Sequence, residues 1–203
     1  MKRIAIFVSG RGTNMDNIIR EVKKKRIRAQ VACVVSDVAD AGALKKALAH
    51  GIKTIFVDPK KFRTKLAFEK EIIKYLRLNC VDYIILAGFM RILSPYIVRL
   101  YRNRILNIHP ALLPSFKGMH GISDAFEAGV KVTGVTVHFV TAELDGGPII
   151  VQKVVEVEKG ETLASLERRI HKIEYELYPR AINLLIQNRL KIKGKRVIIN
   201  SSS

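Results

Sequence analysis

The stretch "KRIAIFVSGRGTNMDNII", residues 2 to 19, decides the fold. Its first part, 3–8, is a short and continuous apolar run rich in Ile, which is typical of a parallel strand buried on both faces. A glycine-rich turn follows, and then a segment expected to be helical over 14–26. A strand, a tight turn and a helix form the repeating unit of an α/β protein.

The same alternation continues through the first half of the chain. Further apolar runs predict strands at 30–35, 53–58, 82–88 and 104–109. The intervening helices are expected at 40–50, 65–78 and 94–101. With right-handed crossovers, this alternation predicts an α/β fold with a doubly wound, mostly parallel open sheet, a variant of the Rossmann fold.

The second half has a different pattern. Strands are expected at 134–140 and 148–157, the second of them antiparallel, and 191–200 resembles a terminal hairpin before a frayed tail. Between them lies a long C-terminal helix, one face of which is formed by Leu163, Leu166, Ile170, Ile173 and Leu177. Thr162 is its expected N-cap, and Pro179 is expected to bend or break it. No repeat or linker divides residues 1–203, so a single domain is expected.

Composition excludes several classes of protein. The chain has 36 Lys and Arg against 18 Asp and Glu, a formal charge of +18 that attracts anions, including nucleic acid, acidic membranes, phosphates and polyglutamylated cofactors. The first apolar run is shorter than the roughly 7 to 15 residues of a secretory signal, and none approaches the roughly 18 of a membrane span. Cys33 and Cys80 lack metal or redox spacing and are expected to be buried, which suits a reducing cytoplasm.

The loop "SGRGTN", residues 9 to 14, is a candidate anion site. Backbone N–H groups and the dipole of the following helix would meet there, with Thr13 or Asn14 as an added donor. Met15 stands where a dinucleotide fingerprint needs a third glycine, so the loop suits one phosphate. A plain turn with Asn14 as a helix cap is the alternative.

The stretch "NIHP", residues 107 to 110, places an amide and an imidazole two positions apart at the end of a strand. Asn107 and His109 therefore project to the same side, at the carboxyl edge where open α/β sheets bind ligands. Two donors that converge there can stabilise the oxyanion of an acyl transfer. A structural histidine at a strand end is the alternative.

Asp145 lies in the loop "ELDGGPI", and it is either a turn residue or a partner of His109. In the second case its charge is expected to raise the pKa of His109 and keep the imidazole protonated. His138 is expected to be a core or sheet-face residue.

Six motifs together resemble one known family, the folate-dependent phosphoribosylglycinamide formyltransferases of purine biosynthesis. The motifs occur in this order: "SGRGTN", "LAGFMRILSP", "LNIHPALLP", "GVTVHFV", "ELDGGPI" and "EYELYP". The resemblance covers about residues 2 to 190. It implies transfer of a formyl group from 10-formyltetrahydrofolate to the amine of glycinamide ribonucleotide, without a metal.

The resemblance also assigns residues. It implies that Asn107, His109 and Asp145 are catalytic. The nucleotide contacts that it implies are Gly12, Thr13, Asn14, His171, Lys172, Ile173 and Glu174. The folate contacts that it implies are Met90, Arg91, Ile92, Leu93, Thr141, Ala142, Glu143 and Leu144, with Lys65 where the family can carry Arg. It divides the chain into a nucleotide-binding half, 1–105, and a folate-binding and catalytic half, 106–203.

The resemblance further implies a cytoplasmic enzyme, monomeric or homodimeric, with no nucleic acid or membrane partner. Three rivals are weighed against it. A formyltransferase of methionyl-tRNA is expected to carry a further C-terminal domain, and a formyltetrahydrofolate hydrolase a further N-terminal one. A basic nucleic-acid-binding protein is expected to gather its charges on one face with aromatics between them.

Overall fold

The computed structural model describes residues 1–200 and divides into two compact units, Met1–Leu106 and Asn107–Ser203. The expected frayed tail, 201–203, lies outside the described residues. None of the helices in residues 1–200 combines the length and hydropathy that crossing a bilayer requires. The assignment of residues 1–203 to a single domain stays a prediction.

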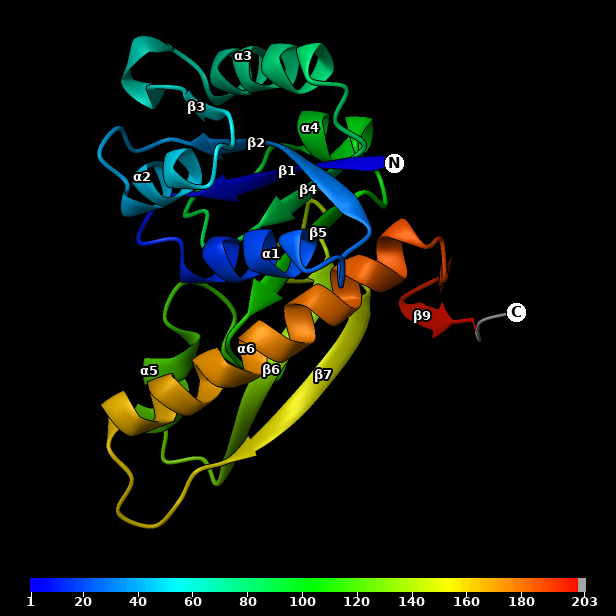
Figure 1. Cartoon of the computed structure of the whole chain (residues 1–203). Helices are drawn as coiled ribbons and strands as arrows, with labels where there is room; N and C mark the ends of the chain where they lie inside the picture. Colours follow the sequence, from blue (N-terminus) through cyan, green and yellow to red (C-terminus); the bar gives the residue numbers. More distant parts are fainter. Residues whose placement is uncertain (201–203) are drawn as a thin grey trace. The chain divides into compact units, whose positions relative to one another are not determined.

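The first unit contains a parallel sheet of short apolar strands (Figure 1). The strands are β1 (Lys2–Val8), β2 (Ala29–Ser36), β3 (Thr54–Phe56) and β4 (Tyr83–Leu86), in the order β3-β2-β1-β4. All three pairings are parallel, and β1 and β4 are buried almost throughout. Because the chain moves outward from β1 to β3 and then returns to the other side of β1, the order reverses between β1 and β4. Sheets of this kind bind ligands at the carboxyl side of that reversal.

The helices of this unit lie in the connections between its strands. They are α1 (Thr13–Lys23), α2 (Gly42–Ala49), the 3-10 turn η1 (Pro59–Lys61), α3 (Lys65–Leu78) and α4 (Pro95–Leu100). Right-handed crossovers put α1 and α2 on one face and α3 and α4 on the other, and each of these two pairs is in contact. This is the doubly wound α/β arrangement that the alternation predicts.

Strand β5 (Ile105–His109) carries the chain from the first unit into the second. The second unit adds β6 (Val132–Phe139), β7 (Ile149–Glu156), β8 (Leu190–Lys193) and β9 (Arg196–Ile199). The β6–β7 pair and the β8–β9 pair are antiparallel, while β7 and β9 are parallel. The predictions of an antiparallel second strand and a terminal hairpin are therefore confirmed.

Two helices complete the second unit. Helix α5 (Gly121–Glu127) was not predicted, and α6 (Leu163–Ile186) is the expected long helix, which packs along β6 and β7 (Figure 1). Thr162 caps α6 as predicted, since its side chain accepts the Ser165 N–H. The expected break at Pro179 is wrong, because the helix continues to Ile186 with Pro179 buried inside it.

Candidate functional site

The turn after β1 leaves the start of α1 without a side-chain cap. Gly12 is the N-cap, with φ 70° and ψ 38°, and it has no side chain that could accept a hydrogen bond from the first turn. The alternative in which Asn14 is a simple cap is therefore wrong, because Asn14 lies inside the helix. The uncapped N–H groups and the helix dipole make this end suited to an anion.

Glycine is the only residue type that fits at position 12. Its φ lies in the left-handed region, and a Cβ there would stand 2.5 Å from the Cβ of Ala43 in α2. The Ala43 N–H donates to the Gly10 carbonyl at 3.1 Å, which holds α2 against the loop. The glycine thus lets a second helix pack directly on the candidate phosphate loop.

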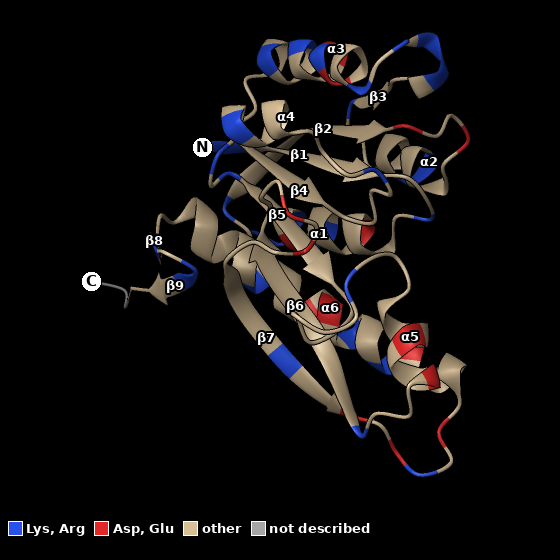
Figure 2. Cartoon of the chain, turned by 180° about the vertical axis from the view of Figure 1, so that it is seen from behind, with Lys and Arg blue, Asp and Glu red and all other residues tan. Residues whose placement is uncertain are grey.

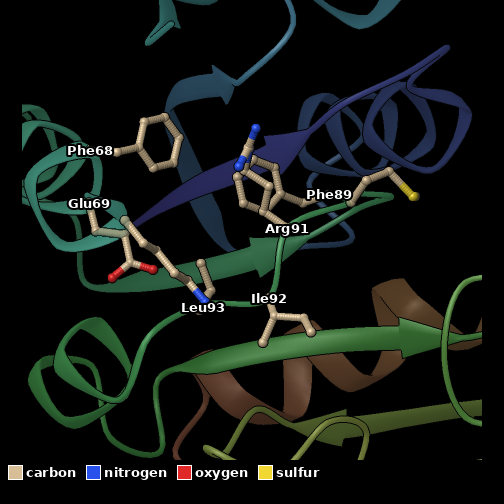
Figure 3. A pocket seen from close by; sticks show the side chains of 8 residues that line it. Phe68, Glu69, Phe89, Arg91, Ile92 and Leu93 are labelled. Atoms are coloured by element: carbon tan, nitrogen blue, oxygen red, sulfur yellow. The ribbon is translucent and has the colours of Figure 1, made fainter. Parts of the chain in front are cut away.

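A cavity of about 290 Å³ lies in the first unit, and the residues of that unit that are predicted to contact folate line it. Lys65 and all four residues from Met90 to Leu93 line it, and the prediction missed Phe68, Glu69 and Phe89. Figure 3 shows Phe68 and Glu69 extending from α3 toward the segment that carries Phe89 to Leu93. Most of the lining is apolar, and within residues 1–200 the Lys65 ammonium forms no ion pair.

In the second unit, the structure brings Asn107, His109 and Asp145 together. The Asn107 Nδ2 lies 3.4 Å from one carboxylate oxygen of Asp145, and the His109 Nδ1 lies 3.5 Å from the other. The two side chains of β5 thus converge, as their spacing predicts, but they converge on Asp145. An ionised carboxylate is the strongest acceptor within reach, which explains why the Asn107 amide is turned toward it.

The Gly-Gly pair after Asp145 makes this placement possible. A Cβ on Gly147 would overlap the Phe139 carbonyl, so the chain passes β6 too closely for any side chain. Asp145 itself has φ 47°. The loop is therefore shaped to deliver the carboxylate, and the interpretation of Asp145 as an ordinary turn residue does not fit.

His138 is the residue of this cluster that the sequence did not single out. It is buried as expected, but its Nε2 lies 3.2 Å from the Asn107 Nδ2 and 3.5 Å from Asp145. Its Nδ1 lies 2.9 Å from the Phe139 carbonyl, which only accepts, so Nδ1 carries a proton. The signal in the sequence was its place at the end of β6, next to the loop that carries Asp145.

Protonation in the cluster differs from expectation. Burial lowers the pKa of His109 below its ordinary value of 6.5, although Asp145 and the bond to Phe116 act in the opposite direction. Burial raises the pKa of Asp145, but contacts with His138, the Gly118 N–H and His109 together bring it below 3.8. The expected rise in the pKa of His109 is therefore wrong, because the side chain is only 2% exposed and desolvation outweighs its partner.

The segment after β5 closes over the cluster. The His109 Nε2 lies 2.7 Å from the Phe116 carbonyl, so this nitrogen carries the proton. The Gly118 N–H donates to Asp145 at 2.9 Å, and the Lys117 ammonium lies 2.8 Å from Glu143. These contacts fix the tautomer of His109 and join the segment to the loop at 141–145.

Two side chains on β6 and β7, the buried Thr136 and the exposed Gln152, fix the start of that segment. The Thr136 hydroxyl donates to the Ala111 carbonyl at 2.7 Å and accepts the Leu113 N–H at 3.1 Å. The Gln152 amide donates to the Leu113 carbonyl at 2.9 Å. The position of His109 and its cover therefore depends on β6 and β7 as well as on β5.

The other predicted contacts of this unit lie in different surroundings. Glu174 of α6 is buried, and one of its carboxylate oxygens lies 2.8 Å from the His171 Nδ1. Its negative charge also acts to raise the pKa of His109. Lys172 is exposed and Ile173 half-buried, since neighbouring helix positions face different directions. Thr141 is half-buried, while Ala142, Glu143 and Leu144 are exposed at the loop surface. In residues 1–200, no group of three acidic, His or Cys side chains could hold a metal ion.

The chain is similar in sequence to known proteins of one family. The family model described as formyl transferase matches residues 2–182. The chain is 42% identical over 186 residues to a phosphoribosylglycinamide formyltransferase of Bacillus subtilis, which covers 92% of this chain and 95% of that protein.

Solved structures agree as well. Glycinamide ribonucleotide transformylase 1 from Symbiobacterium toebii matches with a TM-score of 0.96 at 44% identity, over 99% of this chain and 95% of that one. A formyltetrahydrofolate deformylase from Pseudomonas syringae matches with a TM-score of 0.90 at 26% identity, over 98% of this chain and 66% of that one. The chain therefore belongs to the formyl transferase family.

Proposed function

We propose that this protein transfers a formyl group from 10-formyltetrahydrofolate to the amine of glycinamide ribonucleotide, a step of purine biosynthesis. The products are formylglycinamide ribonucleotide and tetrahydrofolate. Support comes from the family match and from relatives of nearly full length that are named for this activity. The observation that carries the proposal is the convergence of Asn107 and His109 on opposite oxygens of Asp145.

The three residues have separate roles. The neutral amine attacks the formyl carbon, and the oxygen that becomes negative is stabilised by the Asn107 amide and the His109 Nε2–H. The imidazole can donate in either charge state, because its Nε2 carries a proton. This donor reaches a substrate only when its bond to the Phe116 carbonyl opens.

Asp145 acts on protons. Its low pKa keeps it ionised, so it can accept a proton from the attacking amine, through water, and return it toward the departing folate nitrogen. It also accepts the Asn107 amide and so orients that donor. Acceleration then comes from holding the two reactants together and from the donors that stabilise the oxyanion.

The nucleotide is assigned to two sets of residues. Gly12, Thr13 and Asn14 hold its phosphate through the uncapped start of α1. His171, Lys172, Ile173 and Glu174 supply the second contact, with Glu174 as the acceptor for hydroxyl or amide groups. The buried carboxylate of Glu174, held by His171, supports that role.

The folate is assigned to the cavity of the first unit. The apolar lining suits an aromatic ring system, and the unpaired ammonium of Lys65 suits a carboxylate. A lysine contacts that carboxylate with a single point charge, where an arginine would make two parallel bonds. Thr141, Ala142, Glu143 and Leu144 are assigned as further folate contacts.

The remaining assignments complete the proposal. Residues 1–203 form one formyltransferase domain, with a nucleotide-binding half, 1–105, and a folate-binding and catalytic half, 106–203. The cavity assigned to the folate adds contacts from the first half. The formyl folate is a co-substrate, and no metal, nucleic acid or membrane takes part. The enzyme works in the cytoplasm as a monomer or homodimer.

Water is the competing acceptor, because the chain is also similar to a formyltetrahydrofolate deformylase. The test is an assay with 10-formyltetrahydrofolate and three acceptors: glycinamide ribonucleotide, methionyl-tRNA and water alone. Tetrahydrofolate should form rapidly only with the ribonucleotide. Equal release with and without the ribonucleotide would replace the transferase with a hydrolase, and formylation of methionyl-tRNA would replace the acceptor.

A further inference from the structure

The segment Phe89–Ser94 contributes most of the lining of the cavity, yet it belongs to neither a strand nor a helix. Met90 and Ile92 are each 56% exposed, so packing alone does not fix it. Irregular backbone has no ladder of its own and takes its position from other groups. Two carboxylates supply those groups, one at each end.

Asp37, at the end of β2, holds the first end. One oxygen of its carboxylate accepts the Ser9 hydroxyl at 2.6 Å, and the other accepts the Arg91 Nε at 2.9 Å. Because the Ser9 proton is directed to Asp37, the Ser9 oxygen can accept the Met90 N–H, at 2.9 Å. The Asp37 side chain is 7% exposed, whereas the Arg91 side chain is 47% exposed, so the carboxylate is shielded from water and the guanidinium is only partly so.

The Arg91 side chain is held from a second side. Its guanidinium lies over the Phe68 ring at 5.5 Å, and Figure 3 shows the two side chains turned toward each other. Asp37 therefore neutralises one of the two cations of the cavity and leaves Lys65 as the other.

Glu69, in α3, holds the second end. It is 1% exposed, and one of its oxygens accepts the Ser94 N–H at 2.6 Å while the other accepts the Ser94 hydroxyl. The Ser94 oxygen in turn caps α4 by accepting the Tyr96 N–H at 3.3 Å. The buried carboxylate thus fixes the point where the segment enters a helix.

We propose that Asp37 and Glu69 are positioning residues for folate: they fix the two ends of Phe89–Ser94 and thereby preform the wall of the cavity. The proposal rests on the proposed function, because it takes this cavity as the folate site. Both carboxylates act through Ser9, Arg91 and Ser94, so their loss changes the shape of the wall and leaves the chemical step intact.

The kinetic test uses Asp37→Asn and Glu69→Gln, which keep size and remove charge. Each should raise the KM for 10-formyltetrahydrofolate about tenfold, the typical effect of losing a charged hydrogen bond. The turnover number and the KM for the ribonucleotide should stay within about twofold. Asp40→Asn and Glu71→Gln remove the same charges nearby and should change nothing. An unchanged folate KM, or a parallel change in both KM values and turnover, overturns the proposal.

Ser9→Ala provides an internal check. Ser9 and Asp37 belong to the same hydrogen-bond network, so the double variant of these two residues should raise the folate KM little more than either single variant. Asp37 and Glu69 act at opposite ends of the segment, so the effects of Asp37→Asn and Glu69→Gln on the folate KM should multiply. Ser94→Ala removes the hydroxyl that Glu69 accepts, and it serves as the test of this end of the segment if Glu69→Gln does not fold. Multiplying effects of Ser9→Ala and Asp37→Asn would contradict a shared network.

A second measurement needs no activity. Amide hydrogen exchange at Met90 and Ser94 in the ligand-free protein should speed up about tenfold in the two variants and remain unchanged in the two controls. If the wild-type protein formylates no ribonucleotide, the proposed function fails, while the exchange still reports whether the carboxylates fix the segment. Unchanged exchange at both amides overturns the positioning role itself.

Discussion

The two units of the chain differ in net charge and in how deeply their ionisable groups are buried. Met1–Leu106 carries 23 Lys and Arg against 8 Asp and Glu, a formal charge of +15, whereas Asn107–Ser203 carries 13 against 10, a charge of +3. Figure 2 shows more blue than red along α3 and the turn before it. In the second unit the notable ionisable groups are buried: His109, His138 and Glu174 are each less than 5% exposed.

This difference separates binding from chemistry. A positive surface, an uncapped helix start and a preformed cavity attract and hold anionic ligands without needing any proton to move. Proton transfer needs pKa values that differ from those in water, and burial beside other ionisable groups supplies them. Substitutions in the first unit should therefore change affinity, and substitutions in the buried cluster should change turnover.

The largest effect is expected in the buried cluster. His109→Ala should lower the turnover number by about 100-fold or more, since loss of one donor to an oxyanion costs about 2.7–4 kcal/mol. Both KM values should change little, as measured by steady-state kinetics. His50→Ala removes a hydrogen-bonded histidine from the first unit and is the control. Near-normal turnover would remove His109 from the mechanism and break the separation of roles.

The next effect concerns the shape of the phosphate loop. Gly12→Ala should lower the free energy of unfolding by about 2–4 kcal/mol, because it adds left-handed strain and a clash with Ala43. Gly10→Ala is the matched control, since a Cβ there meets nothing within 4 Å. Urea unfolding of both variants measures the difference. Equal losses would show that the loop relaxes and that its backbone shape is not fixed by α2.

A smaller effect is expected at Asn14. Asn14→Ala should raise the KM for the ribonucleotide about tenfold, because one donor to the phosphate is lost, and should leave folate binding and turnover unchanged. Asn17→Ala, one turn further along α1, is the control. Weaker folate binding with unaltered nucleotide affinity would refute the phosphate assignment and would indicate that this loop binds the folate.

The fold could be predicted because its signals are local. Ile-rich runs between glycine turns locate β1, β2 and β4, and the predicted bounds of α3 agree with the structure. The seven-residue helix α5 was missed because it is too short to show a helical period. Cys80, expected to be buried, is exposed, since it takes a left-handed turn with φ 48° directly after α3.

The candidate site could be predicted only in part, because its decisive contacts join distant positions. The spacing of Asn107 and His109 indicates a shared side, but not that Asp145 lies between them. His138 lies 31 residues from Asn107 in the sequence, and Glu69 lies 25 from Ser94. The pKa shift of His109 was predicted in the wrong direction, because it depends on burial that no pattern of residue types reveals.

The smallest effect expected is a pH dependence of stability that belongs to the buried cluster. Because burial lowers the pKa of His109 in the folded protein, the unfolded chain binds its proton first as the pH falls through 6.5. Stability is then complete above that value and declines as the pH falls toward the lower folded-state pKa. His109→Gln keeps a donor for the Phe116 carbonyl but does not titrate, so its melting temperature should fall less than that of the wild type between about pH 8 and pH 5. Asp145, whose pKa is also lowered, adds its own loss only below 3.8, outside this window. Parallel melting curves for the two proteins would mean that His109 titrates alike in the folded and unfolded chains, and would place the pH-sensitive groups elsewhere.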